Sequence, residues 1–184
     1  KPDESDSIEL HTHSTPVIGE RFEVLSLLGE GGMGQVWKIH DKVLDKVLAV
    51  KILRQELALD TSAEKRFEQE TQAAMMLTHS NMVAVYGHGK DSTGSPYLLM
   101  DYLEGENLAE LIRREGFLEP TRVMDISAQV CEALDYAHSK NIVHRDIKPS
   151  NIMIVKTADG NDMVKLVDFG IAKVMPTVNE QTNG

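Results

Sequence analysis

The sequence predicts an α+β protein with strands mainly in its first half and helices mainly in its second. Short apolar runs of strand-like character recur between residues 21 and 103. From about residue 107 to 140, apolar residues recur every three or four positions, as the buried face of a helix requires. A strand-turn-strand pattern after residue 151 adds a hairpin to the helical half.

Composition sets the general class of the protein. The 184 residues are 41% hydrophobic and 26% charged, as in ordinary globular proteins, and the net charge of -10 argues against nucleic-acid or membrane-surface partners. No apolar run reaches the ~18 residues of a membrane span, and the first residues lack a signal-peptide core. We therefore expect a soluble, cytoplasmic chain, with membrane anchorage of a longer parent protein left open. The single cysteine, Cys131, lies on an apolar helical stripe, so we expect a buried thiol.

The first 19 residues are polar and acidic, which predicts a flexible tail. His11 and His13 could supply half of a metal site, but no second histidine or cysteine pair stands at ligand spacing. We therefore expect no metal site in the tail.

Strands are predicted from residue 21 onward by "FEVLSLL", "QVWKI" and "KVLAVKIL". A helix follows, because Thr61 and Glu64 have the spacing of a capping box. Two further strands are predicted at "NMVAVYG" and "PYLLMDYL". The longer of the later helices has a core-facing stripe of Val123, Ile126, Val130, Leu134 and Ala137.

The glycine cluster "GEGGMG", residues 29–34, allows several interpretations. A dinucleotide-binding fingerprint requires a helix directly after the glycines, and a Walker A loop requires Lys followed by Ser or Thr. Gln35 and Val36 follow instead, and the residues after them favour a strand. A glycine-rich hairpin remains, which either brings backbone N–H groups close to phosphates or is an ordinary flexible turn.

Lys51 interrupts the apolar strand "LAVKIL", and a buried lysine needs an anionic partner. In the following helix, Glu70 falls on the same stripe as Phe67, Ala74 and Leu77. We therefore predict a Lys51–Glu70 ion pair. The alternative is a partly exposed glutamate and a lysine whose head reaches solvent.

The segment "HRDIKPSN", residues 144–151, precedes a predicted hairpin made of "IMIVK", "TADGND" and "MVKLV". The midpoint between Asn151 and Asp168 falls within this turn, so we expect the two residues side by side. An amide oxygen and a carboxylate are suitable ligands for Mg²⁺. Asp146 can then stand beside an attacking hydroxyl, with Lys148 adding positive charge.

Four of these motifs together resemble a known family. "GEGGMGQV", "LAVK" with its helix glutamate, "HRDIKPSN" and "DFG" occur in the order found in eukaryotic-like (Hanks-type) bacterial serine/threonine protein kinases. The resemblance covers about residues 21–173 and implies a bilobal fold with a complete β-rich N-lobe, one main N-lobe helix and a partial helical C-lobe. It divides the chain into an acidic tail (1–19), the N-lobe and hinge (20–103), a partial C-lobe (104–173) and the start of an activation loop (174–184), for which we expect disorder.

The resemblance also assigns roles. It implies ATP and Mg²⁺ as ligands, with Lys51 holding the α- and β-phosphates and paired with Glu70, and Asp146 as the catalytic carboxylate. Lys148, in a D-x-K arrangement, favours serine or threonine as acceptor. The residues implied in the phosphate-covering loop are Gly29, Gly31 and Gly34; those implied as Mg²⁺ ligands are Asn151 and Asp168. Those implied around adenine are the gatekeeper Met100, the backbone of Asp101 and Leu103, and the side chains of Val36, Ala49 and Met153.

Two neighbours of Asp146 have implied roles of a different kind. His144 is expected to be a packed, structural imidazole and not a general base. Arg145 resembles the arginine of kinases whose activation loop is ordered by phosphorylation.

The sequence departs from the family after "DFGIAK", where "VMPTVNEQTNG" follows without an A-P-E motif. We therefore expect an incomplete domain of a longer kinase, inactive toward protein because the peptide-holding part is not included. The expected partners are ATP and Ser/Thr protein substrates, without nucleic acid or membrane contact, and self-association is left open. An ATP-binding pseudokinase or regulatory scaffold, or a related small-molecule phosphotransferase, remains an alternative. The presence of Lys51, Asp146 and Asp168 argues against a pseudokinase.

Overall fold

A computed structural model of the chain describes residues 16–31, 34–54 and 61–168. Within the helix that begins at Thr61, the side chains of residues 61–66 and 70 lie outside this description. The expectations for His11, His13 and the segment 174–184 also fall outside the described residues.

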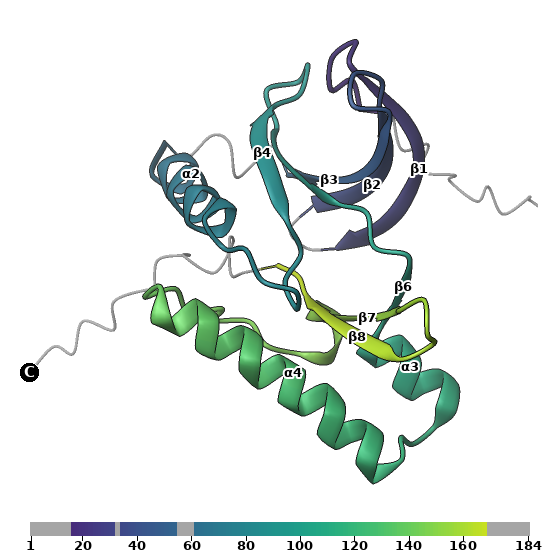
Figure 1. The fold of residues 1–184 in the computed structure, drawn as a ribbon. Helices are drawn as coiled ribbons and strands as arrows, with labels where there is room; N and C mark the ends of the chain where they lie inside the picture. Colours follow the sequence, from purple (N-terminus) through teal and green to yellow (C-terminus); the bar gives the residue numbers. More distant parts are fainter. Residues whose placement is uncertain (1–15, 32–33, 55–60, 169–184) are drawn as a thin grey trace, which may run out of the picture.

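The first half forms a five-stranded antiparallel sheet of order β1-β2-β3-β5-β4, which curves over the rest of the molecule in Figure 1. Its strands are β1 (Phe22–Gly31), β2 (Gly34–Asp41), β3 (Lys46–Leu53), β4 (Val85–Lys90) and β5 (Pro96–Asp101). The central β3 is buried on both faces: Leu48, Val50 and Ile52 pack on one face, and Ala49 and Leu53 pack on the other. This double burial explains the nearly continuous apolar run of β3.

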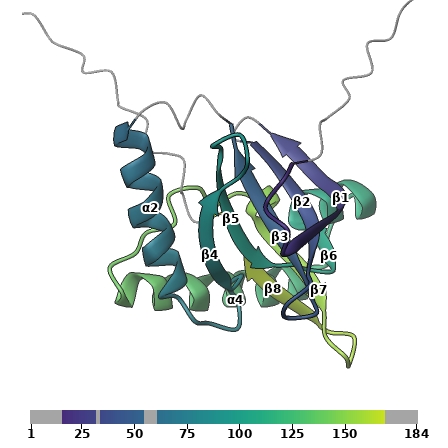
Figure 2. The same ribbon diagram turned by 90° about the horizontal axis from the view of Figure 1, so that it is seen from above.

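Helix α2 (Thr61–Met75) lies beside β4 at one side of the sheet, as Figure 2 shows from above. Phe67 of α2 packs with Ala49 and Leu98 of the sheet. The residues after α2 leave this sheet, because Leu77 and Met82 belong to the hydrophobic core of the second half.

One predicted strand begins later than expected. "NMVAVYG" predicted a strand from residue 81, but β4 begins at Val85. Asn81, Met82 and Val83 are all buried and do not alternate, and Met82 forms an isolated parallel bridge with Leu166. These residues connect the two halves instead of extending β4.

The second half contains α3 (Leu108–Glu115), α4 (Pro120–Ser139), a 3₁₀ turn η1 (Pro149–Asn151) and a three-stranded antiparallel sheet of order β6-β7-β8. The strands are β6 (Gly105–Asn107), β7 (Ile152–Lys156) and β8 (Asp162–Leu166). Asn107 and Glu110 form a capping box at the start of α3. In Figure 1, β7 and β8 lie between the large sheet and α4.

The buried face of α4 differs in part from the predicted stripe. Ile126, Ala133 and Ala137 are buried, but Val123 is 44% exposed, so its assignment to the core was wrong. The expected burial of Cys131 was also wrong, because this thiol is exposed. Each helical residue turns by about 100°, so Cys131 lies about 200° around the helix from Ala133. No helix among the described residues is long and apolar enough to cross a bilayer.

Candidate active site

Lys51 connects the large sheet to the end of β8. Its side chain is 8% exposed, and its Nζ lies 2.7 Å from Oδ1 of Asp168. A lysine buried to this extent needs an anionic partner, which Asp168 provides. The predicted partner Glu70 lies in α2, but its side chain is outside the described part, so the Lys51–Glu70 pair stays a prediction.

Asp168 stands two residues after the end of β8. Because Ile152 pairs with Leu166, Asn151 faces Val167, one position short of the Asp168 that we expected opposite it. The five-residue turn between β7 and β8 is centred on Asp159 and not between Asp159 and Gly160. Asp168 itself has a φ of 57°, a left-handed conformation that costs a non-glycine residue about 1–2 kcal/mol.

Val167 is a site residue that the sequence did not reveal. Its backbone N–H donates to the carbonyl of Asn151 at 3.0 Å, and its own carbonyl lies 2.9 Å from Nε2 of His144. Both contacts use backbone atoms, so the valine side chain gives no signal of them. Val167 thereby fixes the loop of residues 144–151 beside Asp168.

Asp146, Lys148 and Asn151 form one polar group. The Nδ2 of Asn151 donates to the carbonyl of Asp146 at 2.9 Å and to its Oδ2 at 3.1 Å. The Nζ of Lys148 lies 2.8 Å from the same Oδ2. The Asp146 side chain is only 10% exposed, so these contacts hold the carboxylate in a defined orientation.

His144 is 1% exposed, as expected for a structural imidazole. Its Nε2 faces the carbonyl of Val167, and its Nδ1 faces the backbone N–H of Asp146 at 3.4 Å. These contacts match the neutral tautomer with its proton on Nε2. Burial lowers the pKa of His144, partly opposed by the hydrogen bond to Val167 and by the charges of Asp168 and Asp146.

We expect His144 to make unfolding easier as the pH falls below ~6.5, the ordinary pKa of histidine. Its folded-state pKa is lowered, so protons bind preferentially to the unfolded chain in this range and reduce the free energy of unfolding. Urea unfolding between pH 5 and 8 measures this dependence.

His144→Asn should remove part of the pH dependence, whereas His138→Asn, at an exposed position of α4, serves as the matched control. NMR of the ring nitrogens gives a direct check. A His144 imidazole that protonates at or above the ordinary pKa would contradict the expectation.

The glycines of the predicted phosphate loop fall into two groups. At Gly34, φ is 147°, and an added Cβ would lie 1.9 Å from the carbonyl oxygen of Ile52, so the backbone pairing of β2 with β3 requires glycine there. At Gly29 and Gly31, an added Cβ would meet no atom of the described residues within 4 Å. Packing within the described chain therefore does not explain these two glycines, which is compatible with space kept for a ligand.

The residues predicted around adenine mostly share one apolar cluster. Ala49 and Met100 are buried in it, and Val36 and Leu103 pack against it. The N–H of Asp101 is used by the carbonyl of Ala84 at 3.0 Å, which leaves its carbonyl as the candidate contact. Among the described residues, no backbone hydrogen bond uses Leu103, which lies between strands.

Met153, the last residue of this prediction, lies on β7 opposite Asn107 and Lys165. It approaches the cluster from the second half, if it contributes to the same site. Its place beneath an adenine ring stays a prediction.

The available oxygen atoms fit a Mg²⁺ ion. The Nδ2 of Asn151 is occupied by Asp146, which turns the Oδ1 of the amide away from that contact. Asp168 offers Oδ2, since its Oδ1 contacts Lys51. Mg²⁺ accepts one or two such protein oxygens and fills its remaining positions with water and phosphate. No group of three or more His, Cys, Asp or Glu suited to a metal occurs in the described part of the chain.

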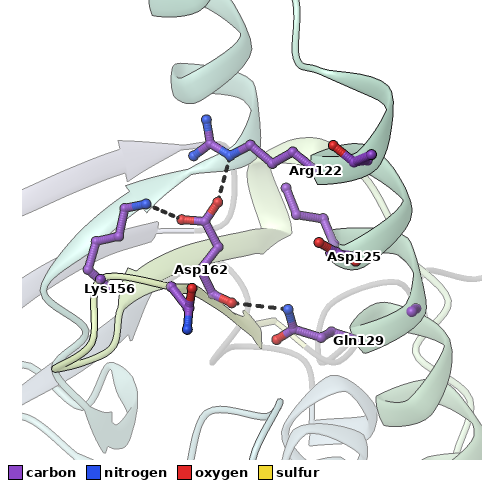
Figure 3. Close-up of a pocket in the computed structure, with 10 residues that line it drawn as sticks. Arg122, Asp125, Gln129, Lys156 and Asp162 are labelled. Carbon is purple, nitrogen blue, oxygen red and sulfur yellow. Dashed lines mark hydrogen bonds and ion pairs between the residues drawn. The ribbon is translucent and has the colours of Figure 1, made fainter.

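A separate pocket of about 560 Å³ lies between α4 and the β7–β8 turn (Figure 3). In it, Asp162 contacts Nε of Arg122 and Nζ of Lys156, both at 2.6 Å, and Gln129 donates to the backbone carbonyl of Asp162 at 3.1 Å. Burial alone would raise the pKa of Asp162, but the hydrogen bonds from Arg122 and Lys156 hold it below the ordinary value. These charges neutralise one another, and none of the predicted site residues lines this pocket.

Comparison with known proteins identifies related sequences. The sequence profile of the protein kinase domain matches residues 22–183. A probable serine/threonine-protein kinase of Streptomyces coelicolor is 42% identical over 161 residues, which cover 86% of this chain and 23% of the relative. The probable serine/threonine-protein kinase PknB of Corynebacterium glutamicum is 41% identical over 172 residues, covering 92% of this chain and 26% of the relative. The chain thus spans about a quarter of the length of these two relatives.

Solved structures show the same fold. The crystal structure of the Mycobacterium tuberculosis PknI kinase domain matches with a TM-score of 0.75 and 29% identity, covering 87% of this chain and 64% of that one. The crystal structure of Rad53 1–466 in complex with AMP-PNP matches with a TM-score of 0.71 and 28% identity, covering 82% of this chain and 38% of that one.

Proposed function

Since the chain belongs to the protein kinase family, we propose that it binds ATP with Mg²⁺ and provides the groups that transfer the γ-phosphate to serine or threonine hydroxyls of proteins. The observation that carries this proposal is the grouping of Lys51 with Asp168 and of Asp146 with Lys148 and Asn151. Relatives named serine/threonine-protein kinases and a similar structure with AMP-PNP support the acceptor and the nucleotide.

Each group has a defined task in the proposed reaction. Asp146 orients the acceptor hydroxyl and takes its proton, while the hydroxyl oxygen forms a bond to the γ-phosphorus and the bond from that phosphorus to ADP breaks. Lys148, 2.8 Å from Asp146, balances negative charge at the transferring phosphoryl group. Lys51 holds the α- and β-phosphates, and Gly29, Gly31 and Gly34 let the backbone of the loop approach them.

Asn151 and Asp168 would hold Mg²⁺ through their side-chain oxygens. The bound ion supplies charge neutralisation at the phosphate oxygens. The Asn151–Asp146 hydrogen bonds support this assignment because they link the orientation of the proposed metal ligand to that of the proposed catalytic carboxylate.

Calorimetry with ATP, with and without Mg²⁺, tests the proposal. We expect Mg²⁺ to strengthen ATP binding and Asp168→Asn to weaken Mg-ATP binding at least about tenfold, because a charge-assisted contact is lost. Asp159→Asn, in the exposed turn between β7 and β8, is the matched control and should leave binding unchanged. Binding that ignored both the metal and the Asp168 substitution would overturn the metal-site assignment.

A further inference from the structure

Three side chains meet at the outer end of β5. The Nζ of Lys46 donates to the hydroxyl of Tyr86 at 2.6 Å and lies 2.9 Å from Oδ1 of Asp101. The Tyr86 hydroxyl donates to the same Oδ1 at 2.6 Å. The ammonium group also lies 4.5 Å from the centre of the Tyr86 ring. Each of the three groups therefore contacts both of the others.

A backbone irregularity places Tyr86 in this group. In the pairing of β4 with β5, Val85 faces Met100 but Gly87 faces Leu99, so Tyr86 is an extra residue. Such a bulge redirects a side chain relative to the regular strand. Asp101 is the last residue of β5, and its N–H is held by Ala84 next to the bulge.

A second lysine holds the following residue. The Nζ of Lys38 on β2 lies 4.1 Å from the ring centre of Tyr102, a cation–π contact. Two consecutive residues of the connection between the halves are thus held by lysines of the large sheet. The next residue, Leu103, packs against the apolar cluster of Ala49 and Met100.

We propose that Lys46, Tyr86 and Asp101, with Lys38 and Tyr102, form a hinge clamp that positions the backbone of residues 101–103 and thereby sets the affinity for the adenine end of ATP. This inference rests on the proposed ATP binding. The clamp residues are positioning residues, because they act through the backbone edge that adenine would contact.

The exposure of the clamp supports a positioning role over a stabilising one. The side chains of Lys46 and Asp101 are 46% and 27% exposed, and ion pairs this exposed contribute little to folding. The pKa values nevertheless indicate a well-formed group. The hydrogen bonds to Tyr86 and Asp101 raise the pKa of Lys46. Burial alone would raise the pKa of Asp101, but the hydrogen bonds from Tyr86 and Lys46 lower it overall.

Separate ligands for the two ends of ATP test the clamp. Adenosine carries the base without phosphates, and tripolyphosphate carries the phosphates without the base. We expect Lys46→Met to weaken adenosine binding about 5- to 10-fold and Tyr86→Phe about 2- to 3-fold, as loss of such polar contacts implies. Tripolyphosphate binding with Mg²⁺ should change less than about twofold in both variants.

Two further variants complete the experiment. Lys46→Arg keeps the charge and should retain most of the adenosine affinity. Lys42→Met removes a lysine of the same β2–β3 hairpin, whose Nζ contacts only the carbonyl of Glu20 at 3.0 Å among the printed neighbours of the clamp strand, and should change neither ligand.

The outcomes separate the two proposals. Equal adenosine affinity in the original chain, Lys46→Met and Tyr86→Phe would overturn the clamp while leaving ATP binding intact. Parallel loss of adenosine and tripolyphosphate binding would also overturn it, because the substitutions would then act on the fold as a whole. Failure of the original chain to bind ATP would overturn both the clamp and the proposed function.

Discussion

Replacing Asp146 with asparagine is expected to lower phosphoryl transfer about 100- to 10,000-fold in a protein that contains this chain together with the rest of a kinase domain. Asparagine keeps the size of the side chain and can still accept hydrogen bonds from Asn151 and Lys148, so the local fold should survive. It cannot take the proton of the acceptor hydroxyl. Transfer of radiolabelled phosphate from ATP to generic Ser/Thr protein substrates measures the loss.

The matched control is Asp135→Asn, the same substitution at an exposed position of α4. It should leave turnover unchanged, and ATP binding should be similar in both variants. A loss of less than about tenfold in Asp146→Asn would exclude Asp146 as the base, since general-base catalysis contributes more.

The same assay on the 184-residue polypeptide alone should give almost no protein phosphorylation. The chain covers 64% of the PknI kinase domain structure, and placement of the acceptor supplies much of the rate in such reactions. Asp146→Asn should then change almost nothing. Robust Asp146-dependent phosphorylation by the polypeptide alone would show that its own residues hold the substrate.

The second large effect concerns stability. Leu166→Ala is expected to lower the free energy of unfolding by about 2–5 kcal/mol, the usual cost of a large cavity in a core. Leu166 is fully buried, in the cluster that joins α4, β8 and the segment after α2. This loss is a large fraction of the ~5–15 kcal/mol that stabilises a typical domain. Urea unfolding measures it.

Leu44→Ala provides the control, because Leu44 is 60% exposed between β2 and β3. The same substitution there should change the free energy of unfolding by less than about 0.5 kcal/mol. Similar losses at both positions would mean that the core around Leu166 is not closely packed.

Local pattern predicted much of the fold. The first three strands, the helices after residues 60, 107 and 119, and the β7–β8 hairpin all appear where periodicity and turn residues placed them. The kinase-like architecture expected from the resemblance is confirmed by the matching solved structures. These features depend on neighbours within one element, which a sequence shows directly.

Features that depend on contacts between elements were predicted less well. The late start of β4 follows from the burial of Asn81 and Met82 against the second half, and the exposure of Cys131 follows from which face of α4 meets β8. The one-residue shift of Asn151 relative to Asp168 follows from the exact length of a turn. None of these can be read from the periodicity of a single segment.

The candidate site shows the same division. The residue types of the four motifs predicted Lys51, Asp146, Asn151 and Asp168, and the structure places Lys51 against Asp168 and Asn151 against Asp146. The backbone role of Val167 and the contact of Tyr86 with Asp101 have no motif. They arise from a strand end and a bulge, which only the folded chain defines.

The bridge between Met82 and Leu166 has a mechanical consequence. Beside it, the N–H of Val83 donates to the carbonyl of Leu166 at 3.0 Å, and the N–H of Leu166 donates to the carbonyl of Asn81 at 2.8 Å. The two halves are thus joined at the rear by this short ladder and elsewhere by the covalent connection at residues 102–104. Two bodies joined at two places rotate most easily about the line through both joints. Opening and closing of the halves would therefore be a one-axis rocking motion on the microsecond-to-millisecond scale, with Lys51 and Asp168 separating as it opens.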